Sequence, residues 1–397
     1  MNQAHVLIFD EVPPKEFLGI RRSVPRMGFE NEKQKDTGPN QGGPQNRARS
    51  LQREGAGEDT KKKEAPGVGK PPVISDLHLW GNFRVRDLLH HFYPEKEHAT
   101  IFSMRERGAF RRLLKFLEKR EAKERLIVGR TGNVTLLDWN GLLSTVRGTR
   151  NLVKLQVGKI PSDLYVLRKQ ELIEVAAGWE KGEAPGSQGF LSWLFDGFLF
   201  HNFEKILDVR GFSFLLRNSY EYHRENILIA DSLGSKRYAD LYRRLPPGSL
   251  ANITVTESGD VSSSVLGGGV KVEGVVRGSV IFSGVTIGKS SVIRDSVILP
   301  SNTIEEGVTL QNTLVLEGNR RVIGGGSSIG GGREAQNRWY PDILKQGLTV
   351  IGEGVEIPSD SRIGAGCLVT GSGAGPERPI DLDDGEVYDS DSRAGLL

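Results

Sequence analysis

Two groups of arginines are the residues whose type and spacing point most directly to chemistry. Arg21, Arg22 and Arg26 lie close together, and Arg320 and Arg321 are adjacent later in the chain. The guanidinium group presents two parallel N–H donors that match the geometry of a phosphate. Each group is therefore a candidate for binding a phosphate, although each arginine taken singly could be an ordinary surface residue.

The cysteine and the histidines give weaker indications of a functional site. The only cysteine, Cys367, excludes an intramolecular disulfide framework and a Cys-based zinc site, and it suits a reducing compartment. His90 and His91 lie beside a helix-like segment without a paired carboxylate, so a surface or packing role is expected for them. No metal site and no cofactor are predicted from these residues.

A six-residue step between aliphatic residues dominates the last 150 residues. Three runs keep this step: Val275, Ile281, Ile287, Ile293 and Leu299; Ile304, Leu310, Leu316 and Val322; Ile351, Ile357, Ile363 and Val369. The period matches neither a helix nor an alternating strand. It is typical of a hexapeptide solenoid, in which three short strands and three turns make a triangular coil of about 18 residues. The pattern predicts a left-handed parallel β-helix with these side chains, and Cys367, pointing inward.

Glycine supports the solenoid and histidine limits its chemistry. The chain has 50 glycines, 27 of them from Gly248 onward, where they can turn the corners of the coils. Hexapeptide solenoids are often acyltransferases with a histidine as general base, yet none of the seven histidines lies in the repeat. The solenoid is therefore expected to serve assembly or effector binding.

The first 250 residues have a different pattern. Short apolar runs predict buried parallel strands, and amphipathic stretches predict helices. The strands are expected at 6–9, 125–129, 163–167 and 226–230, and the helices at 104–125 and 168–179. Strands that alternate with helices predict an α/β sheet with crossover connections.

Composition sets the domain limits. We expect an α/β domain over 1–247, the β-helix over 248–375 and an acidic tail over 376–397. Residues 30–72 are polar, rich in Gly and Pro and mixed in charge, which predicts a disordered insertion and disfavours a basic arm for RNA. The net charge of +3 makes nucleic-acid binding unlikely, and no long apolar segment or secretion signal is present, so a cytoplasmic protein without a membrane span is expected.

An α/β domain followed by a β-helix, together with several local motifs, resembles the ADP-glucose pyrophosphorylase (glucose-1-phosphate adenylyltransferase) family. The resemblance is best from about Pro161 to Val369. The segments that carry it are SDLYVLRKQELIEV (162–175), ILDVRGFSFLLRNSYEYHREN (206–226), the solenoid (278–324), YPDILKQGLTVIGEGVEIP (340–358) and, near the start, SVPRMGF (23–29). It implies a nucleotidyltransferase-like, Rossmann-like first domain that transfers a nucleotidyl group from ATP to a sugar phosphate with Mg²⁺.

The phosphate loop that this chemistry needs is missing. Backbone N–H groups of a Gly-rich loop after the first strand cradle the triphosphate in the family. Here the strand VLIF is followed by Asp10 and Glu11, then by Pro13 and Pro14, and no glycine occurs before Gly19. Acidic residues repel a polyanion, and proline has no N–H to donate.

The metal-binding carboxylate of the family is also replaced. RLIVGRTGNVTLLDWNGLL (125–143) resembles the family segment in which an Asp after a Gly binds the metal, and the matching residues are Gly132 and Asn133. An amide contributes no charge against Mg²⁺. Asp138 and Asp208 remain as degenerate substrate-site candidates, while the sugar-phosphate motif E-x-EKP has no clear counterpart.

These departures favour a non-catalytic, regulatory subunit, without a catalytic residue, that forms a homo- or hetero-oligomer with a catalytic paralogue in ADP-glucose and glycogen synthesis. The arginines named first lie where the resemblance places a sugar-phosphate effector. Two alternatives stay open. One is an active glucose-1-phosphate adenylyltransferase that needs Mg²⁺, and the other is an assembly scaffold unrelated to sugar nucleotides, as subunits of a translation-initiation exchange factor are.

Overall fold

A computed structural model describes most of both expected domains, and all described residues belong to one compact unit. The described residues are 4–10, 76–81, 83–92, 99–104, 109–120, 124–137, 142, 146, 151–157, 160–180, 189–209, 211–231, 252–318, 321–332, 334–371 and 378–390. The predicted insertion at 30–72 lies outside them.

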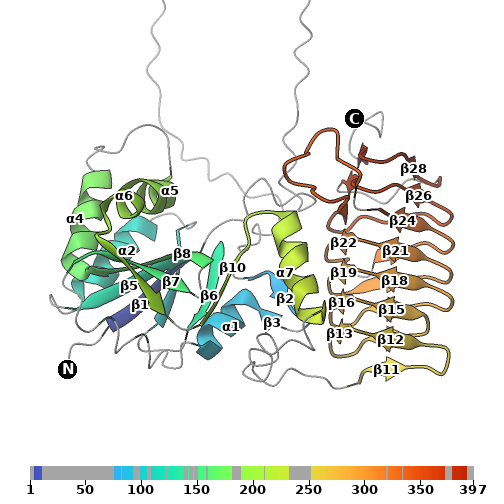
Figure 1. Ribbon diagram of the computed structural model, residues 1–397, viewed down its shortest axis with the longest axis horizontal. Helices are drawn as coiled ribbons and strands as arrows, with labels where there is room; N and C mark the ends of the chain where they lie inside the picture. The colour runs from blue at the N-terminus through green and yellow to red at the C-terminus, as the bar shows by residue number, and fades with distance from the viewer. Residues whose placement is uncertain are drawn as a thin grey trace, which may run out of the picture. The chain divides into compact units, whose positions relative to one another are not determined.

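A six-stranded sheet forms the first domain, in the order β4-β1-β5-β8-β7-β9 (Figure 1). Its strands are β1 (Ala4–Asp10), β4 (Ala99–Ser103), β5 (Arg125–Arg130), β7 (Val153–Val157), β8 (Ile160–Arg168) and β9 (Lys205–Val209). The predicted α/β sheet is confirmed, but β8 is antiparallel to both β5 and β7, so the expectation of a parallel strand at 163–167 is wrong. Only residues 158–159 separate β7 from β8, and so short a link permits a hairpin but no crossover.

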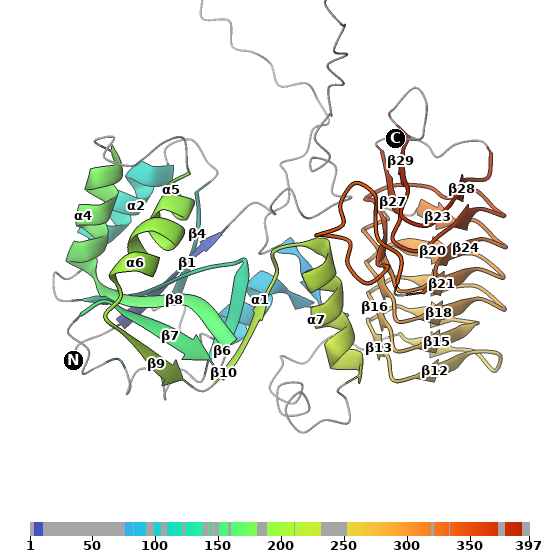
Figure 2. The same cartoon turned by 45° about the horizontal axis from the view of Figure 1, so that its top comes forward.

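Helices cover one face of this sheet, as Figure 2 shows. They are α2 (Ala109–Glu118), α4 (Lys169–Glu180) and a continuous segment made of α5 (Phe190–Ser192), the π-helix η2 (Trp193–Leu199) and α6 (Phe200–Asn202). Their core includes Leu7, Phe9 and Val128 from the sheet. The alternate residues Val6, Ile8 and Ile127 point to the other face, where α1 (Val85–Phe92) and the antiparallel pair β6 (Asn133–Leu137) and β10 (Gly211–Leu215) pack.

The run at 226–230 is helical, so the strand expected there is wrong. It belongs to α7 (Ser219–Asp231), whose residues Asn226, Ile227, Ile229 and Ala230 are all buried. The helix contacts β10 on one side and the solenoid strands β16 and β19 on another. A helix that is buried nearly all round has no polar face to reveal its period, and a short apolar run cannot distinguish it from a strand.

The second domain is a parallel β-helix with three sheets, which confirms the predicted solenoid (Figure 1). Its strands are β11 (Thr254–Val255), β12 (Asp260–Ser262), β13 (Val265–Leu266), β14 (Lys271–Val272), β15 (Val275–Arg277), β16 (Val280–Ile281), β17 (Thr286–Ile287), β18 (Val292–Arg294), β19 (Val297–Ile298), β20 (Asn302–Ile304), β21 (Thr309–Gln311), β22 (Thr313–Val315), β23 (Arg321–Ile323), β24 (Ser328–Gly330), β25 (Thr349–Ile351), β26 (Arg362–Ile363), β27 (Leu368–Thr370), β28 (Asp381–Leu382) and β29 (Val387–Asp389). β28 and β29 lie in the segment assigned to an acidic tail, so the solenoid extends to Asp389 rather than ending at 375.

The repeat has 17 residues in its regular part rather than 18. Val275 pairs with Val292, and Val292 pairs with Thr309. One of the three steps therefore spans five residues, and four predicted inward positions move by one. The side chains in the prism are those of Val276, Ile298, Val315 and Ile323, where the strict six-residue step had placed Val275, Leu299, Leu316 and Val322. Cys367 points inward as expected, and burial raises the pKa of its thiol to about 11.

One sheet of the solenoid is apolar on its outer side as well. In this sheet (β13-β16-β19-β22-β25-β27-β29) every strand except β29 carries two adjacent aliphatic residues, such as Val297 and Ile298, and β29 carries Val387 and Tyr388. Ile298 points into the prism, while Val297 joins the core shared with α7. Farther along the solenoid, Leu344 and Leu348 of the long loop between β24 and β25 belong to that same core. The outer face is thus buried by α7 and by this loop.

A short hairpin contacts both α7 and the solenoid. It consists of β2 (His78–Leu79) and β3 (Phe83–Arg84). The His78 ring packs edge-on against Phe282 of the solenoid with 5.9 Å between ring centroids, and the Tyr222 hydroxyl of α7 donates to the His78 carbonyl oxygen. Burial, reinforced by the charge of Arg84 and opposed by that of Asp87, lowers the pKa of His78 to about 4.

Acid is expected to weaken this contact. Because the pKa of His78 in the folded chain is about 4 and its ordinary value is 6.5, the unfolded chain binds the extra proton first as the pH falls. The free energy of unfolding should therefore decline between pH 6.5 and 4. Urea unfolding across this range should show a steeper decline for the wild type than for His78→Phe, which keeps a ring against Phe282. The exposed His201 provides the control, since equal slopes in His78→Phe and His201→Gln would contradict the assignment.

In the part of the chain that the structure describes, no helix is both long and apolar enough to cross a membrane.

Candidate functional site

The carboxyl ends of β1 and β5 form a polar edge on the first domain. The two strands are parallel neighbours, so Asp10 at the end of β1 and Thr131 just after β5 meet. Thr131 donates its backbone N–H to the Phe9 carbonyl oxygen at 3.0 Å and its hydroxyl to Asp10 Oδ1 at 3.3 Å. Both residues are buried. In α/β sheets, ligands bind outside the carboxyl ends of strands, which makes this edge the candidate site.

The antiparallel pair of strands β6 and β10 extends this edge, and Asn133 lies at the start of β6. The Asn133 side chain is 5% exposed, and its Oδ1 accepts hydrogen bonds from the hydroxyls of Thr135 at 2.9 Å and Ser213 at 3.0 Å. Thr135 and Ser213 are cross-strand partners, which places both hydroxyls on one face of this two-stranded sheet. The amide oxygen of Asn133 is therefore engaged within the protein.

These groups do not fit Mg²⁺. The ion prefers carboxylate oxygens, and the set made of Asp10, Thr131, Asn133, Thr135 and Ser213 contains one carboxylate. The Asn133 oxygen carries no charge and already has two donors. Within the described ranges, moreover, no group of three or more His, Cys, Asp or Glu side chains could hold a metal ion.

The arginine at this edge is engaged by acids. Arg130, the last residue of β5, donates from Nε to Asp163 at 2.8 Å and pairs with Asp196 at 3.0 Å. Its guanidinium also lies 5.4 Å from the centre of the Phe195 ring. Asp196 and Phe195 belong to the π-helix η2, so Arg130 fixes that helix to the sheet. Two carboxylates neutralise the positive charge that a triphosphate would require here.

The structure brings few of the predicted site residues together. Asn133 lies at the candidate site, whereas Asp208 is exposed on β9, the edge strand, opposite Gln156. Asp138 lies outside the described residues. So do four of the five arginines, Arg21, Arg22, Arg26 and Arg320, and only the backbone of the fifth, Arg321, is described.

Three residues of the edge, Thr131, Thr135 and Ser213, were missed from the sequence, and Asp10 was noted only as an acid that follows the first strand. A weak signal existed, because Asn133 and Thr135 alternate with apolar residues in a strand that is otherwise buried, and Ser213 stands between two phenylalanines. Alternation shows which residues share a face of one strand, but it does not say which two strands pair.

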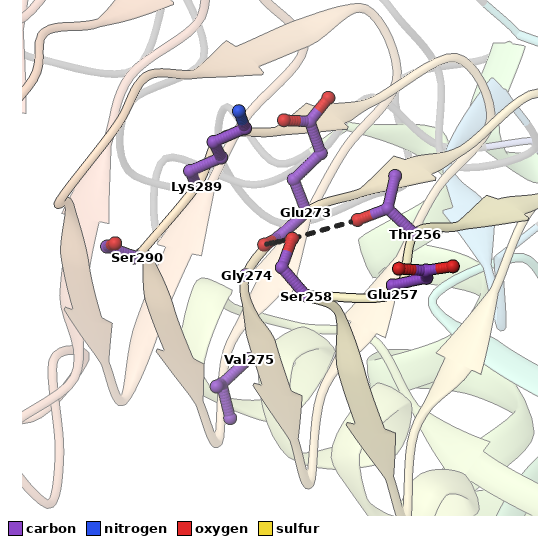
Figure 3. Close-up of a pocket in the computed structure, with 8 residues that line it drawn as sticks. All are labelled: Thr256, Glu257, Ser258, Glu273, Gly274, Val275, Lys289 and Ser290. Carbon is purple, nitrogen blue, oxygen red and sulfur yellow. Dashed lines mark hydrogen bonds between the residues drawn. The ribbon is translucent and has the colours of Figure 1, made fainter.

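A second polar place lies on the solenoid, at one corner of its first three coils (Figure 3). The corners of the first and third coils have four residues each, 256–259 and 288–291, while the corner of the second has only Glu273 and Gly274. The short corner leaves a hollow of about 740 Å³ between its longer neighbours. A Cβ on Gly274 would lie 2.4 Å from the Ser291 carbonyl oxygen, so this close approach requires glycine.

Hydroxyls and charges of both signs line the hollow. Ser258 donates to the Glu273 carbonyl oxygen at 3.1 Å, and Lys289 stands on the opposite wall from Thr256 and Glu257 (Figure 3). A hydrogen bond from Lys271 lowers the pKa of Glu273 below its ordinary value. No histidine or cysteine is among the residues that line the hollow, so it lacks the histidine base of acyl transfer.

Comparison with known proteins finds similarity to a hexapeptide-repeat family in the solenoid and to a glucose-1-phosphate adenylyltransferase. The family model described as GlmU-like, C-terminal hexapeptide matches residues 246–351. A protein of Pseudothermotoga lettingae named glucose-1-phosphate adenylyltransferase is 48% identical over 118 residues, which are 30% of this chain and 27% of that relative. The aligned segment thus spans about a quarter of the relative's length. The chain is therefore similar to this adenylyltransferase over that segment.

Proposed function

We propose that this chain is a non-catalytic subunit of a glucose-1-phosphate adenylyltransferase, which acts in ADP-glucose and glycogen synthesis by assembling with a catalytic subunit. The 48% identity to a protein of that name supports the family. One observation supports the proposed absence of catalysis. The uncharged amide of Asn133 lies at the carboxyl edge, and its oxygen already accepts hydrogen bonds from Thr135 and Ser213.

The sequence before and after this edge supports the same conclusion. Pro13 and Pro14 follow β1, where a triphosphate cradle would need backbone donors. Arg130 is bound to Asp163 and Asp196. The loss of a single charge-stabilising contact can already slow an enzyme by about 10²–10³-fold, and here loop, metal ligand and basic group depart together. The buried free thiol of Cys367 suits the reducing environment of the cytoplasm.

The chain alone should release no pyrophosphate from ATP, glucose 1-phosphate and Mg²⁺. Asn133→Asp should be inactive as well, because the new carboxylate restores one ligand and leaves the phosphate loop without donors. Pyrophosphate is measured with a coupled colorimetric assay, and the Pseudothermotoga lettingae relative serves as the positive control. Turnover by the wild-type chain would support the alternative of an active adenylyltransferase, and turnover by Asn133→Asp alone would refute the importance of the loop.

Effector binding forms a second part of the proposal. Arg21, Arg22, Arg26, Arg320 and Arg321 are proposed to bind the phosphates of a sugar-phosphate effector. Binding of a labelled sugar bisphosphate should weaken in Arg21→Ala and in Arg320→Ala. Unchanged affinity in both variants would remove these arginines from the effector site.

A further inference from the structure

Trp80, at the turn of the β2–β3 hairpin, contacts α7 and β10 near the junction between the first domain and the solenoid. It is 2% exposed. Its backbone N–H donates to Asn226 Oδ1 at 2.8 Å, and its indole N–H donates to the Glu225 carbonyl oxygen at 3.2 Å, both on α7. Trp80 is thereby fixed on α7 at its main chain and at its ring.

On the side of the candidate site, the Trp80 ring packs against Phe214 of β10 with 5.3 Å between ring centroids. Phe214 follows Ser213 directly and is the cross-strand partner of Val134. Ser213 in turn donates to Asn133 at 3.0 Å. Trp80 is therefore in contact with the pair of strands, β6 and β10, that carries Asn133.

On the solenoid side, the same β2–β3 hairpin and α7 are held by three contacts. His78 packs on Phe282, which is fully buried, and Ser283 donates to the Gly81 carbonyl oxygen at 3.5 Å. The His223 ring donates from Nε2 to the Asp295 carbonyl oxygen at 2.9 Å. The β2–β3 hairpin is thus part of a continuous series of contacts that runs from the solenoid to the candidate site.

The backbone of Trp80 is strained. Its φ is +54°, a left-handed conformation that is rare for a bulky residue. Such conformations persist only where the surroundings hold them, and they collect at clamps and switch regions. The contacts with Asn226, Glu225 and Phe214 supply this hold.

We propose that Trp80 is a positioning residue that couples the β6–β10 strand pair to the solenoid, so that contacts made by the solenoid set how readily the strand pair with Asn133 opens. The coupling is reciprocal, because a ligand that orders this strand pair must favour the same state of the solenoid junction. The proposal rests on the proposed function for its biological use, since it would let assembly through the solenoid regulate what binds at the carboxyl edge.

Amide hydrogen exchange of the full chain, without partner or ligand, tests the coupling. The perturbation is Phe282→Leu, which removes the aromatic ring under His78 and keeps an apolar side chain. Peptides covering β6 and β10 should exchange about fivefold faster or more in this variant, the lower end of ordinary coupling between sites. In a Trp80→Ala background, Phe282→Leu should cause no further acceleration of exchange. If the Trp80→Ala chain does not fold, Trp80→Phe serves as the background instead.

The control is Ile329→Val, a substitution in the core of the solenoid and away from the β2–β3 hairpin. It should leave the exchange of β6 and β10 unchanged. Equal acceleration by Ile329→Val and Phe282→Leu would show general destabilisation and overturn the coupling, as would an effect of Phe282→Leu that persists without Trp80. The exchange measurement needs no catalytic partner. The coupling can therefore be confirmed even if the proposed function is wrong, and it can be refuted without affecting the proposed function.

Discussion

Replacement of Gly330 by alanine is expected to remove about 3 kcal/mol or more from the free energy of unfolding of the solenoid. Gly330 ends β24 with φ +79°, and a Cβ there would lie 2.0 Å from the Gln311 carbonyl oxygen and 2.6 Å from Thr313 Oγ1. Both neighbours belong to the adjacent coil, and the nearer is backbone, which cannot rotate away. Strain of the main chain and steric overlap therefore add. Urea unfolding followed by far-ultraviolet circular dichroism measures the loss.

Gly284→Ala is the matched control for this substitution. Gly284 also has a positive φ, +71°, but its Cβ would have no neighbour within 4 Å. Only the conformational penalty of about 1–2 kcal/mol should appear. Losses of equal size in the two variants would contradict the close approach of the coils at Gly330.

The second large effect is expected for Val297→Asp. Val297 points outward from β19, but it is fully buried in the core shared with α7. Removal of a buried valine side chain costs about 1.5–3 kcal/mol, and an unpaired carboxylate adds its desolvation, so about 4 kcal/mol should be lost. Circular dichroism during urea unfolding again provides the measurement.

A neighbour in the same coil supplies the control. Val292 also points outward, from β18 on a different sheet, and it is only partly buried. Val292→Asp should cost less than about 1 kcal/mol, as surface substitutions usually do. If Val292→Asp proved as damaging as Val297→Asp, the sheet that contains β19 would not be distinguished by a covering helix.

Much of the solenoid could be predicted from the sequence, because its period is local. The coils repeat inward aliphatic side chains and small or polar corner residues at a regular spacing, so the type of fold follows from that spacing. The register did not follow fully. Leu299 keeps the strict step, yet Ile298 points inward, because one corner of the coil is a residue shorter. Where two aliphatic residues are adjacent, as Val297 and Ile298 are, the sequence alone does not show which of the two points into the solenoid.

The first domain was harder to predict, because its order of strands depends on contacts between distant segments. The apolar runs of β1 and β5 identify strands correctly, whereas the run in α7 is helical since two domains enclose it. For the candidate site, Asn133 was found through a resemblance between segments. Its partner Thr135 lies two residues later on the same face of β6, which alternation indicates only weakly. Its partner Ser213 needed the pairing of β6 with β10, which brings Ser213 to Thr135 across 78 positions of the sequence.

Pyrophosphate release, measured while the purified chain is titrated into a catalytic glucose-1-phosphate adenylyltransferase from the same organism, tests the central claim most directly. The account predicts no release by this chain alone and a saturable change in the rate or effector response of the catalytic subunit, with the two chains co-eluting as one complex. Release by this chain alone, or a catalytic rate that stays unchanged at saturating amounts without a complex, would contradict it.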